Sequence, residues 1–316
     1  MGRYILRRML LMIPTLIGIS IVVFMMVRFI PGDVVDTILG EYGAADDELR
    51  EQLRDQYQLN DSVVTQYFEW LGDVVQGDLG RSIISNREVL EEIRHRSVPS
   101  IELAIITVIL GLLIAIPIGI ISAARQDSVL DYVARSSAIG FLAIPGFWLG
   151  TLVVTLPSRW WGWSPPLEYH DFTEDPVENI YILIIPAAIL ALSFAGTVMR
   201  LMRAQMLEVL HQDYIRTAWA KGLRERSVIV RHALKNALIP VVTVIGLQIP
   251  VLIGGVVIVE TIFGIPGIGS YLYQSIISRD YPIVQGVNLL VAVVVLLSNL
   301  AVDVTYAYLD PRIRYS

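Results

Sequence analysis

Side chains that commonly perform chemistry are few and far apart in this sequence of 316 residues. It contains no cysteine, so disulfides, thiolate nucleophiles and sulfur-ligated metals are excluded. Its histidines are scattered without a metal-ligand spacing, at His95, His170, His211 and His232. No G-x-x-x-x-G-K-[ST] occurs and no glycine precedes a lysine, so we expect the chain neither to bind nor to split ATP. The sequence therefore predicts a protein without catalytic residues, cofactor or metal of its own.

One polar stretch, residues 213–223, has the pattern of a short helix between two turns. Its letters are D-Y-I-R-T-A-W-A-K-G-L. We expect Asp213 to cap the start of this helix and Gly222 to end it in the left-handed conformation. Ser227 is then expected to cap a second helix that runs into the next apolar segment.

The short helix has one face that suits a protein partner. Residues three and four apart share this face, namely Tyr214, Thr217, Ala218 and Lys221. A helix this short is marginal in water and needs to pack against something. We therefore take it as a candidate docking site, and the alternative is a basic loop that only fixes membrane topology.

The elements around this stretch are apolar. Hydrophobic residues make up 54% of the chain, with a mean hydropathy of +0.60. Six uncharged stretches each approach the roughly 20 residues that a helix needs to cross a bilayer. They are Met9–Val27, Leu103–Ala124, Ser136–Ser158, Ile180–Met199, Asn236–Val259 and Tyr281–Val302. The sequence thus predicts an all-α integral membrane protein with six transmembrane helices, rather than long buried helices in a soluble core.

The distribution of Lys and Arg predicts the orientation, because positively charged loops stay in the cytoplasm. Arginines precede the first span, and the loop 200–235 is rich in Lys and Arg. Segments 31–99 and 157–178 are instead acidic or nearly free of bases. We therefore expect cytoplasmic N- and C-termini and two external loops. The formal net charge of -6 then reflects the acidic outer loops and does not indicate nucleic-acid binding.

Three segments complete the organisation. The first apolar run is too long for a cleaved signal peptide, so we keep it as a span. Residues 261–278 are uncharged but broken by glycines and a proline, which predicts an outer loop or a re-entrant piece. In the long external loop, helical spacing predicts helices over 46–58 and 63–75, capped by Asp46 and Asp61, although a solvated cover over the outer face is equally compatible. We divide the chain into residues 1–98 and a core of residues 99–316 with five spans and the cytoplasmic loop 200–235.

Charged side chains lie near the ends of the spans, so no ionisable group is expected at mid-membrane. The polar candidates for lining a pathway are Gln248, Asn288 and Asn299. Prolines within the spans predict kinks, at Pro14, Pro117, Pro145, Pro186 and Pro250. The energy for transport is thus expected from outside this chain. A self-contained channel or secondary transporter is the alternative, and it would have to rely on the three polar residues.

Residues 216–222 resemble the E-A-A-x-x-x-G signature of permease subunits of ATP-binding-cassette importers. The form here, R-T-A-x-A-K-G-L, is similar to that of the dipeptide, oligopeptide and nickel permease group. Further stretches resemble the same group, namely 31–33, 77–82, 231–237, 266–269, 279–282 and 309–312. Arg216 replaces an acid of the general signature, and Lys235 stands about where sugar permeases have a proline. Both departures suit the peptide and nickel branch.

The resemblance implies a type I ABC importer permease fold in the cytoplasmic membrane of a prokaryote. It implies that the helix carrying Asp213, Tyr214, Arg216, Thr217, Ala218, Lys221 and Gly222 docks on a cytoplasmic ATPase. The implied partners are a second homologous permease, two ABC ATPases that bind ATP and Mg, and an extracytoplasmic solute-binding protein. The implied cargo is a di- or oligopeptide, and nickel chelates or oligosaccharides are the alternatives within the same importer class.

Overall fold

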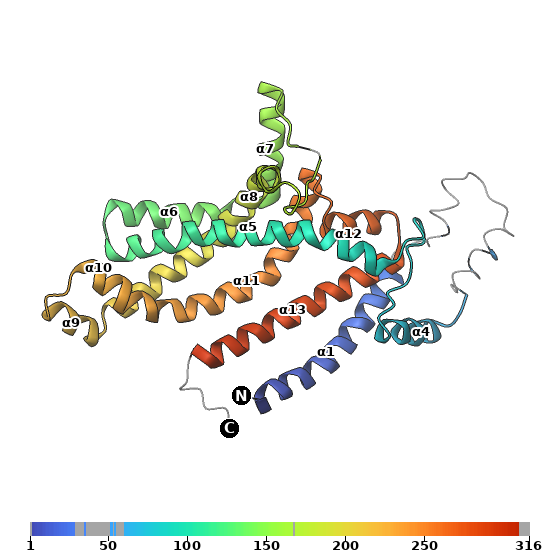
Figure 1. The fold of residues 1–316 in the computed structure, drawn as a ribbon, viewed down its shortest axis with the longest axis horizontal. Helices are drawn as coiled ribbons and strands as arrows, with labels where there is room; N and C mark the ends of the chain where they lie inside the picture. Colours follow the sequence, from blue (N-terminus) through green and yellow to red (C-terminus); the bar gives the residue numbers. More distant parts are fainter. Residues whose placement is uncertain are drawn as a thin grey trace. The chain divides into compact units, whose positions relative to one another are not determined.

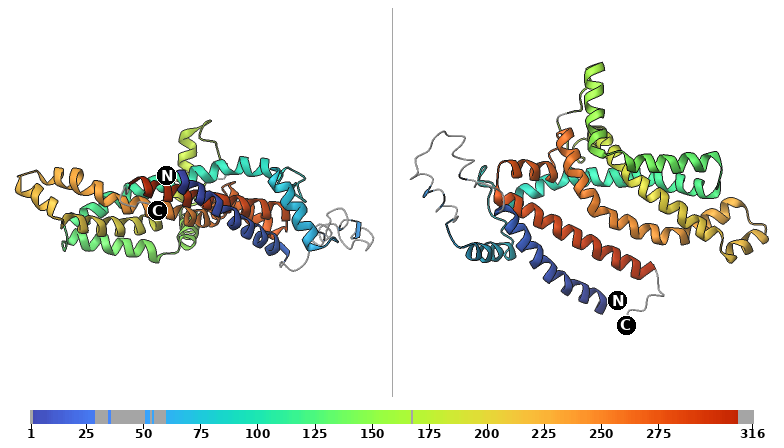
Figure 2. Two further views of the ribbon diagram at one scale, coloured as in Figure 1. Left: turned by 90° about the horizontal axis from the view of Figure 1, so that it is seen from below. Right: turned by 180° about the vertical axis from the view of Figure 1, so that it is seen from behind.

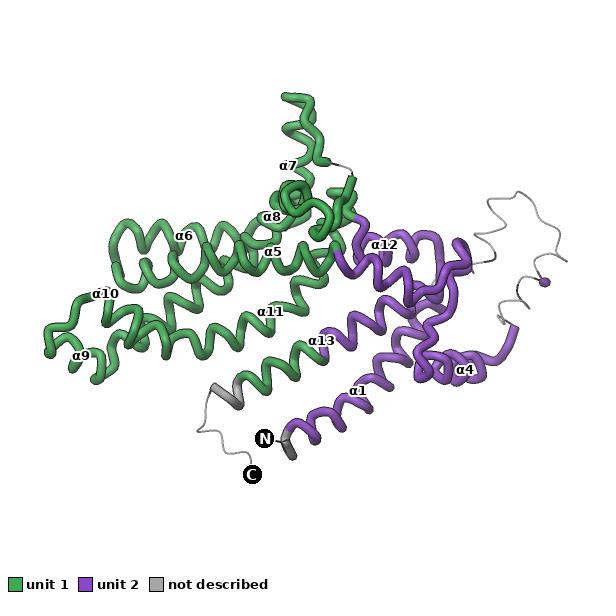
Figure 3. Tube along the Cα trace, viewed as in Figure 1, with its two compact units in different colours: residues 1, 99–265, 297–316 green, residues 2–98, 266–296 purple. Residues whose placement is uncertain are grey.

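The computed structural model describes residues 2–28, 35, 51–52, 54, 60–166 and 168–309. In these ranges the chain is helical, and the extended pairing is confined to one isolated bridge between Arg81 and Glu88. Most of the predicted helix over 46–58, including its expected cap Asp46, lies outside the described residues, as do the stretch 31–33 and the residues after Leu309. Figure 3 colours two compact units: unit 1 holds residues 99–265 and 297–316 together with residue 1, and unit 2 holds residues 2–98 and 266–296.

Five helices of the described chain are long and apolar enough to cross a membrane (Figure 1). They are α1 (Gly2–Arg28), α5 (Val89–Ala124), α8 (Pro176–Leu210), α11 (Leu234–Phe263) and α13 (Tyr281–Leu309). All five contain a predicted span. The all-helical membrane architecture is therefore confirmed.

The remaining predicted span is bent. Residues 136–158, expected as one helix, are divided between α6 (Val129–Ala143) and α7 (Gly146–Trp161), which meet at 88°. The helix stops at Ile144 because the residue before Pro145 disfavours the helical conformation and the proline cannot donate a backbone hydrogen bond. If the bent pair is one span, the described chain has six.

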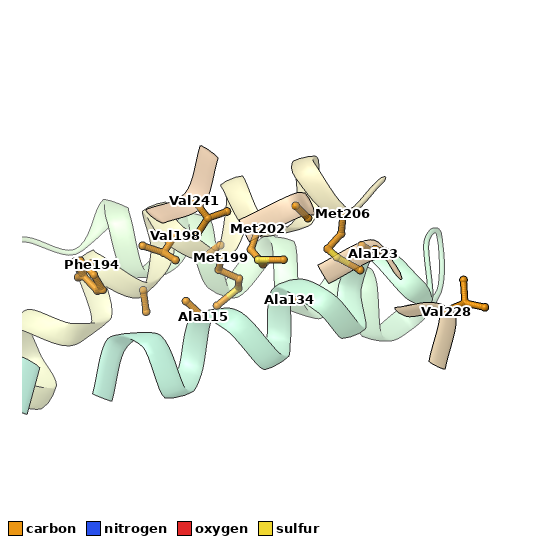
Figure 4. Packing of buried hydrophobic residues seen from close by; sticks show 14 of the residues in the cluster. Ala115, Ala123, Ala134, Phe194, Val198, Met199, Met202, Met206, Val228 and Val241 are labelled. Atoms are coloured by element: carbon orange, nitrogen blue, oxygen red, sulfur yellow. The ribbon is translucent and has the colours of Figure 1, made fainter. Parts of the chain in front are cut away.

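Helix α8 is the centre of unit 1, where it packs against α6, α7 and α11. Figure 4 shows the cluster of small and flexible side chains that fills this core, among them Ala115, Ala134, Phe194, Met199 and Met202. Helix α5 approaches α8 closely at Gly119, where an added Cβ would lie 2.8 Å from the Cβ of Met202. The absence of a side chain at Gly119 thus permits this packing.

In unit 2, α4 (Val63–Val75) has the predicted bounds and packs on α1. The Tyr67 and Ser20 hydroxyls are 2.9 Å apart, and the Tyr67 ring meets Phe24 edge-on at 5.3 Å. The prediction of Asp61 as its cap is wrong, because the hydroxyl of Ser62 accepts the Thr65 N–H at 3.1 Å. A serine one residue later has the extended backbone that a cap requires.

A buried carboxylate connects two distant stretches of unit 2. Asp280 is 2% exposed and accepts hydrogen bonds from the Ser82 hydroxyl at 2.5 Å and the Ile83 N–H at 3.2 Å. Residues 77–82 and 279–282, both noted in the sequence, are therefore in direct contact. Between them in sequence, part of the uncharged segment 261–278 forms α12 (Ile268–Ile277), which is too short to cross a bilayer.

Candidate functional site

The candidate docking helix is α9 (Asp213–Ala220), which lies at one end of unit 1 in every view of Figures 1 and 2. The prediction that Asp213 caps it is wrong. Gln212 is the capping residue, without a side-chain hydrogen bond, and Asp213 is the first residue of the helix. Its carboxylate is still favourable there, because the N-terminus of a helix carries partial positive charge.

The end of α9 is as predicted. Gly222 has φ +72°, which is the left-handed region, and its N–H donates to the Trp219 carbonyl at 2.9 Å. The next N–H, from Leu223, donates to the Ala218 carbonyl at 3.4 Å. These bonds satisfy carbonyls at the helix end and turn the chain sharply.

The segment after α9 differs from the prediction. Ser227 does not cap a helix, since α10 (Glu225–Ser227) already begins two residues earlier. From Val228 to Ala233 the chain forms a π-helix, which passes directly into α11. A capping serine is unnecessary because the helix continues through it. Short π-helical turns occur frequently at functional sites.

Helix α9 has a buried face and a free face. Ile215 is 0% and Ala218 is 6% exposed, and both join the core with Val228 and Ala233 of the π-helix. Ala218 therefore anchors α9 to its own chain, which corrects the prediction that it faces a partner. Sequence spacing alone could not decide which of two adjacent faces is covered.

The free face of α9 contains the other predicted residues, Tyr214, Thr217 and Lys221, all exposed. The Tyr214 hydroxyl accepts a hydrogen bond from the Asn236 amide at 2.8 Å, which ties α9 to α11. Two apolar side chains that the sequence reading missed are also exposed, Trp219 at 44% and Leu223 at 37%. Trp219 follows the buried Ile215 by four residues and therefore lies at the edge of the buried strip, whereas Leu223 lies beyond the turn at Gly222.

Charge on the free face is mostly positive. Arg216 makes one exposed ion pair with Asp213, with the Nη1–Oδ1 distance 3.5 Å. An exposed pair of this kind contributes little stability, so Arg216 remains available to a partner. Lys221 makes no hydrogen bond or ion pair with another side chain in the described part of the chain.

A buried ion pair supports α8 before it leads into α9. Asp131 is fully buried and accepts two hydrogen bonds from Arg203, from Nε at 2.7 Å and Nη2 at 2.8 Å. The Ser122 hydroxyl donates to the same carboxylate at 2.5 Å. This clamp joins α5, α6 and α8. The sequence analysis did not single out Asp131. The signal that could have identified it is an acidic residue at the beginning of a long apolar helix, four residues after Asp127.

The three predicted pathway residues lie in α11 and α13. Gln248, Asn288 and Asn299 are each half-buried. The Asn288 amide donates to the Val284 carbonyl of its own helix at 2.7 Å. No hydrogen bond joins the three to one another in the ranges that the structure describes, and their place along a pathway remains a prediction.

In the described residues, no group of three or more His, Asp and Glu side chains is arranged to hold a metal ion. The free face of α9 stays a candidate site for binding a protein. It holds aromatic, apolar and basic side chains on a rigid helix, a composition that is enriched at protein interfaces.

Two family descriptions match the chain. Residues 115–315 match "Binding-protein-dependent transport system inner membrane component", and residues 1–104 match the N-terminal region of the same kind of component. The free face of α9, the clamp and the pathway candidates lie in or at the border of the first match.

Similar proteins extend over the whole length. The chain is 42% identical to the oligopeptide transport system permease protein AppB of Bacillus subtilis, with 100% of both chains covered. It is 40% identical to the dipeptide transport system permease protein DppB of Alkalihalophilus pseudofirmus (99% of each chain), and 38% identical to DppB of Escherichia coli K12 (100% of this chain and 99% of that protein).

A solved structure shares the fold. It is described as the crystal structure of an amino acid ABC transporter with histidines, and it matches with a TM-score of 0.51 at 14% sequence identity, covering 71% of this chain and 95% of that chain. The family matches, the full-length relatives and the shared helical fold agree, and the chain belongs to the family of inner-membrane components of binding-protein-dependent transport systems.

Proposed function

We propose that this chain is a membrane-spanning subunit of a peptide importer that receives its energy from separate ATPase subunits. The observation that carries the proposal is similarity over the complete length to proteins named as oligopeptide and dipeptide permeases. The match includes both the spans and the polar segment 213–223. It therefore covers the parts that a permease needs for passage of its cargo and for coupling to an ATPase.

We assign the coupling of transport to ATP hydrolysis to α9. The sequence contains no P-loop, so ATP and Mg are assigned to partner subunits. We assign Tyr214, Thr217 and Lys221, together with Trp219, to contacts with an ATPase. Ile215 and Ala218 hold α9 on the π-helix, so a displacement of α9 is transmitted to α11.

The rest of the assembly follows from the same proposal. A second homologous permease completes the pathway, and an extracytoplasmic solute-binding protein delivers the peptide. The positive-inside distribution places α9 in the cytoplasm, with the segment 60–88 on the outer side of a prokaryotic inner membrane. Access to the pathway then alternates between the two sides as the ATPases close and open.

Reconstitution tests this function. The chain is placed in proteoliposomes with a candidate second permease, candidate ABC ATPases and a candidate binding protein from the same organism, and uptake of a labelled dipeptide and tripeptide is measured. We expect uptake that requires both ATP and the binding protein, and no uptake by this chain alone. Peptide uptake by the chain alone without ATP would contradict the proposal and favour a self-contained carrier.

A further inference from the structure

Unit 2 contains a cavity of about 550 Å³. Its walls come from α1, α4, the turn 81–86 and the start of α13. This volume lies in the range of about 300–1,000 Å³ that is typical of small-molecule sites. One wall is fixed in place, because Ser82 and Ile83 are bonded to the buried Asp280.

The acidic side chains of the cavity are unpaired. Glu69 and Asp73 are four residues apart on α4, so their carboxylates lie on the same face of the helix. Neither forms an ion pair or a side-chain hydrogen bond with any described residue. Two like charges at this spacing repel each other, and a cation between them relieves the repulsion.

The basic side chains of the cavity are already engaged. The Arg28 guanidinium donates to the Gln66 side chain and lies 3.6 Å from the centre of the Phe24 ring. Arg81 forms an ion pair with Glu88 at 2.9 Å. Arg28 keeps its positive charge because its partners are neutral, but the two carboxylates outnumber it, so the net charge of the cavity is negative and favours a cationic group.

A buried amide adds independent evidence for a ligand. Gln285 of α13 is only 6% exposed and lines the cavity. Its side chain makes no hydrogen bond to any described residue. The amide is open to the cavity, where it offers both a donor and an acceptor to a bound molecule.

The cation that fits is an organic ammonium rather than a metal ion. Aromatic rings of Trp70 and Tyr281 line the cavity, and such rings attract ammonium groups. Mg²⁺ and Ca²⁺ instead require about six or more oxygen ligands. The described chain has no group of three acidic or histidine side chains that could begin such a shell.

We propose that this cavity binds the free ammonium end of a short peptide, with Glu69 and Asp73 holding the charge and Gln285 holding the adjacent peptide group. The inference rests on the proposed function, because it assumes that the cargo is a peptide. The positive-inside distribution places the cavity on the outer side, so it acts as a site that the peptide occupies before it enters the membrane. A short peptide fits a volume of about 550 Å³ better than a partner protein does, because a partner protein requires a broad surface.

Binding of trialanine to the complete complex in nanodiscs tests the proposal by calorimetry. Glu69→Gln with Asp73→Asn is compared with Glu91→Gln, a matched change at an exposed acid of α5 that does not line the cavity. We expect the double variant to bind trialanine at least about tenfold more weakly, and the control to match the unaltered complex. N-acetyl-trialanine, which lacks the ammonium, is expected to bind the unaltered complex about tenfold more weakly than trialanine does.

Equal affinity of the double variant and the unaltered complex for trialanine would overturn the inference, as would equal binding of the acetylated peptide. Displacement of trialanine by CaCl₂ would assign the cavity to a metal ion and would also overturn the inference. ATP-dependent uptake of trialanine is measured with the same purified complexes after their reconstitution into proteoliposomes with the binding protein. Uptake without the expected binding differences refutes only the proposed peptide site in the cavity. Absence of uptake by the unaltered complex refutes the proposed function.

Discussion

Single residues determine both the stability of unit 1 and the geometry of α9. Asp131 is buried and held by both Arg203 and Ser122. Removal of one partner of a buried ion pair typically costs about 3–5 kcal/mol, because the other charge is left uncompensated. We therefore expect Asp131→Ala to lower the melting temperature of the purified chain strongly. Asp131→Leu combined with Arg203→Met should recover most of the loss, and a double variant as unstable as the single one would contradict the account.

The turn that follows α9 depends on the left-handed conformation of Gly222. Its φ of +72° strains a β-branched residue, whereas an added Cβ would meet no atom within 4 Å. We expect Gly222→Val to cost about 1–2 kcal/mol locally and to abolish coupled ATP hydrolysis and uptake while the chain still inserts. Gly222→Asn is the matched control, because asparagine tolerates the left-handed conformation. Wild-type uptake by Gly222→Val would count against this assignment.

At the scale of the elements, the free face of α9 is predicted to bind the ATPase. Trp219 is exposed on α9, next to the buried Ile215, and is the type of residue that dominates protein interfaces. We expect Trp219→Glu to weaken copurification of the ATPase by about tenfold, because a charge replaces an apolar contact. Trp219→Phe retains the aromatic surface and should copurify normally. Unchanged copurification of Trp219→Glu would place the interface elsewhere.

The π-helix 228–233 sets the rotation of α9 relative to α11. A π-helical turn contains one residue more than an α-helical turn, so deletion of the exposed Val230 should restore α geometry and rotate α9 by about 100°. We expect this deletion to uncouple ATP hydrolysis from uptake. Replacement of Val230 by alanine, which leaves the length unchanged, should preserve coupling, and normal coupling in the deletion variant would show that the π-helix is not needed.

At the scale of the whole molecule, sequence pattern predicted the elements better than their contacts. Apolar runs and turn residues such as Gly222 located the helices, because these signals are local. A kink at Pro145 was predicted, but the 88° angle that divides the span and the burial of Ala218 were not, because a single residue type does not report how a helix packs. The Asp131–Arg203 pair joins residues far apart in sequence, and no periodicity reports such a contact.

The central claim is that this membrane-spanning chain, which has no ATPase of its own, is coupled to partner ATPase subunits through α9. The chain has no cysteine, so Thr217→Cys introduces a single thiol on the free face of α9. In the assembled complex, crosslinking from this thiol to the ATPase subunit should succeed and change in yield when ATP is added. Failure to crosslink, together with labelling of the thiol by a membrane-impermeant reagent from the external side, would contradict the account.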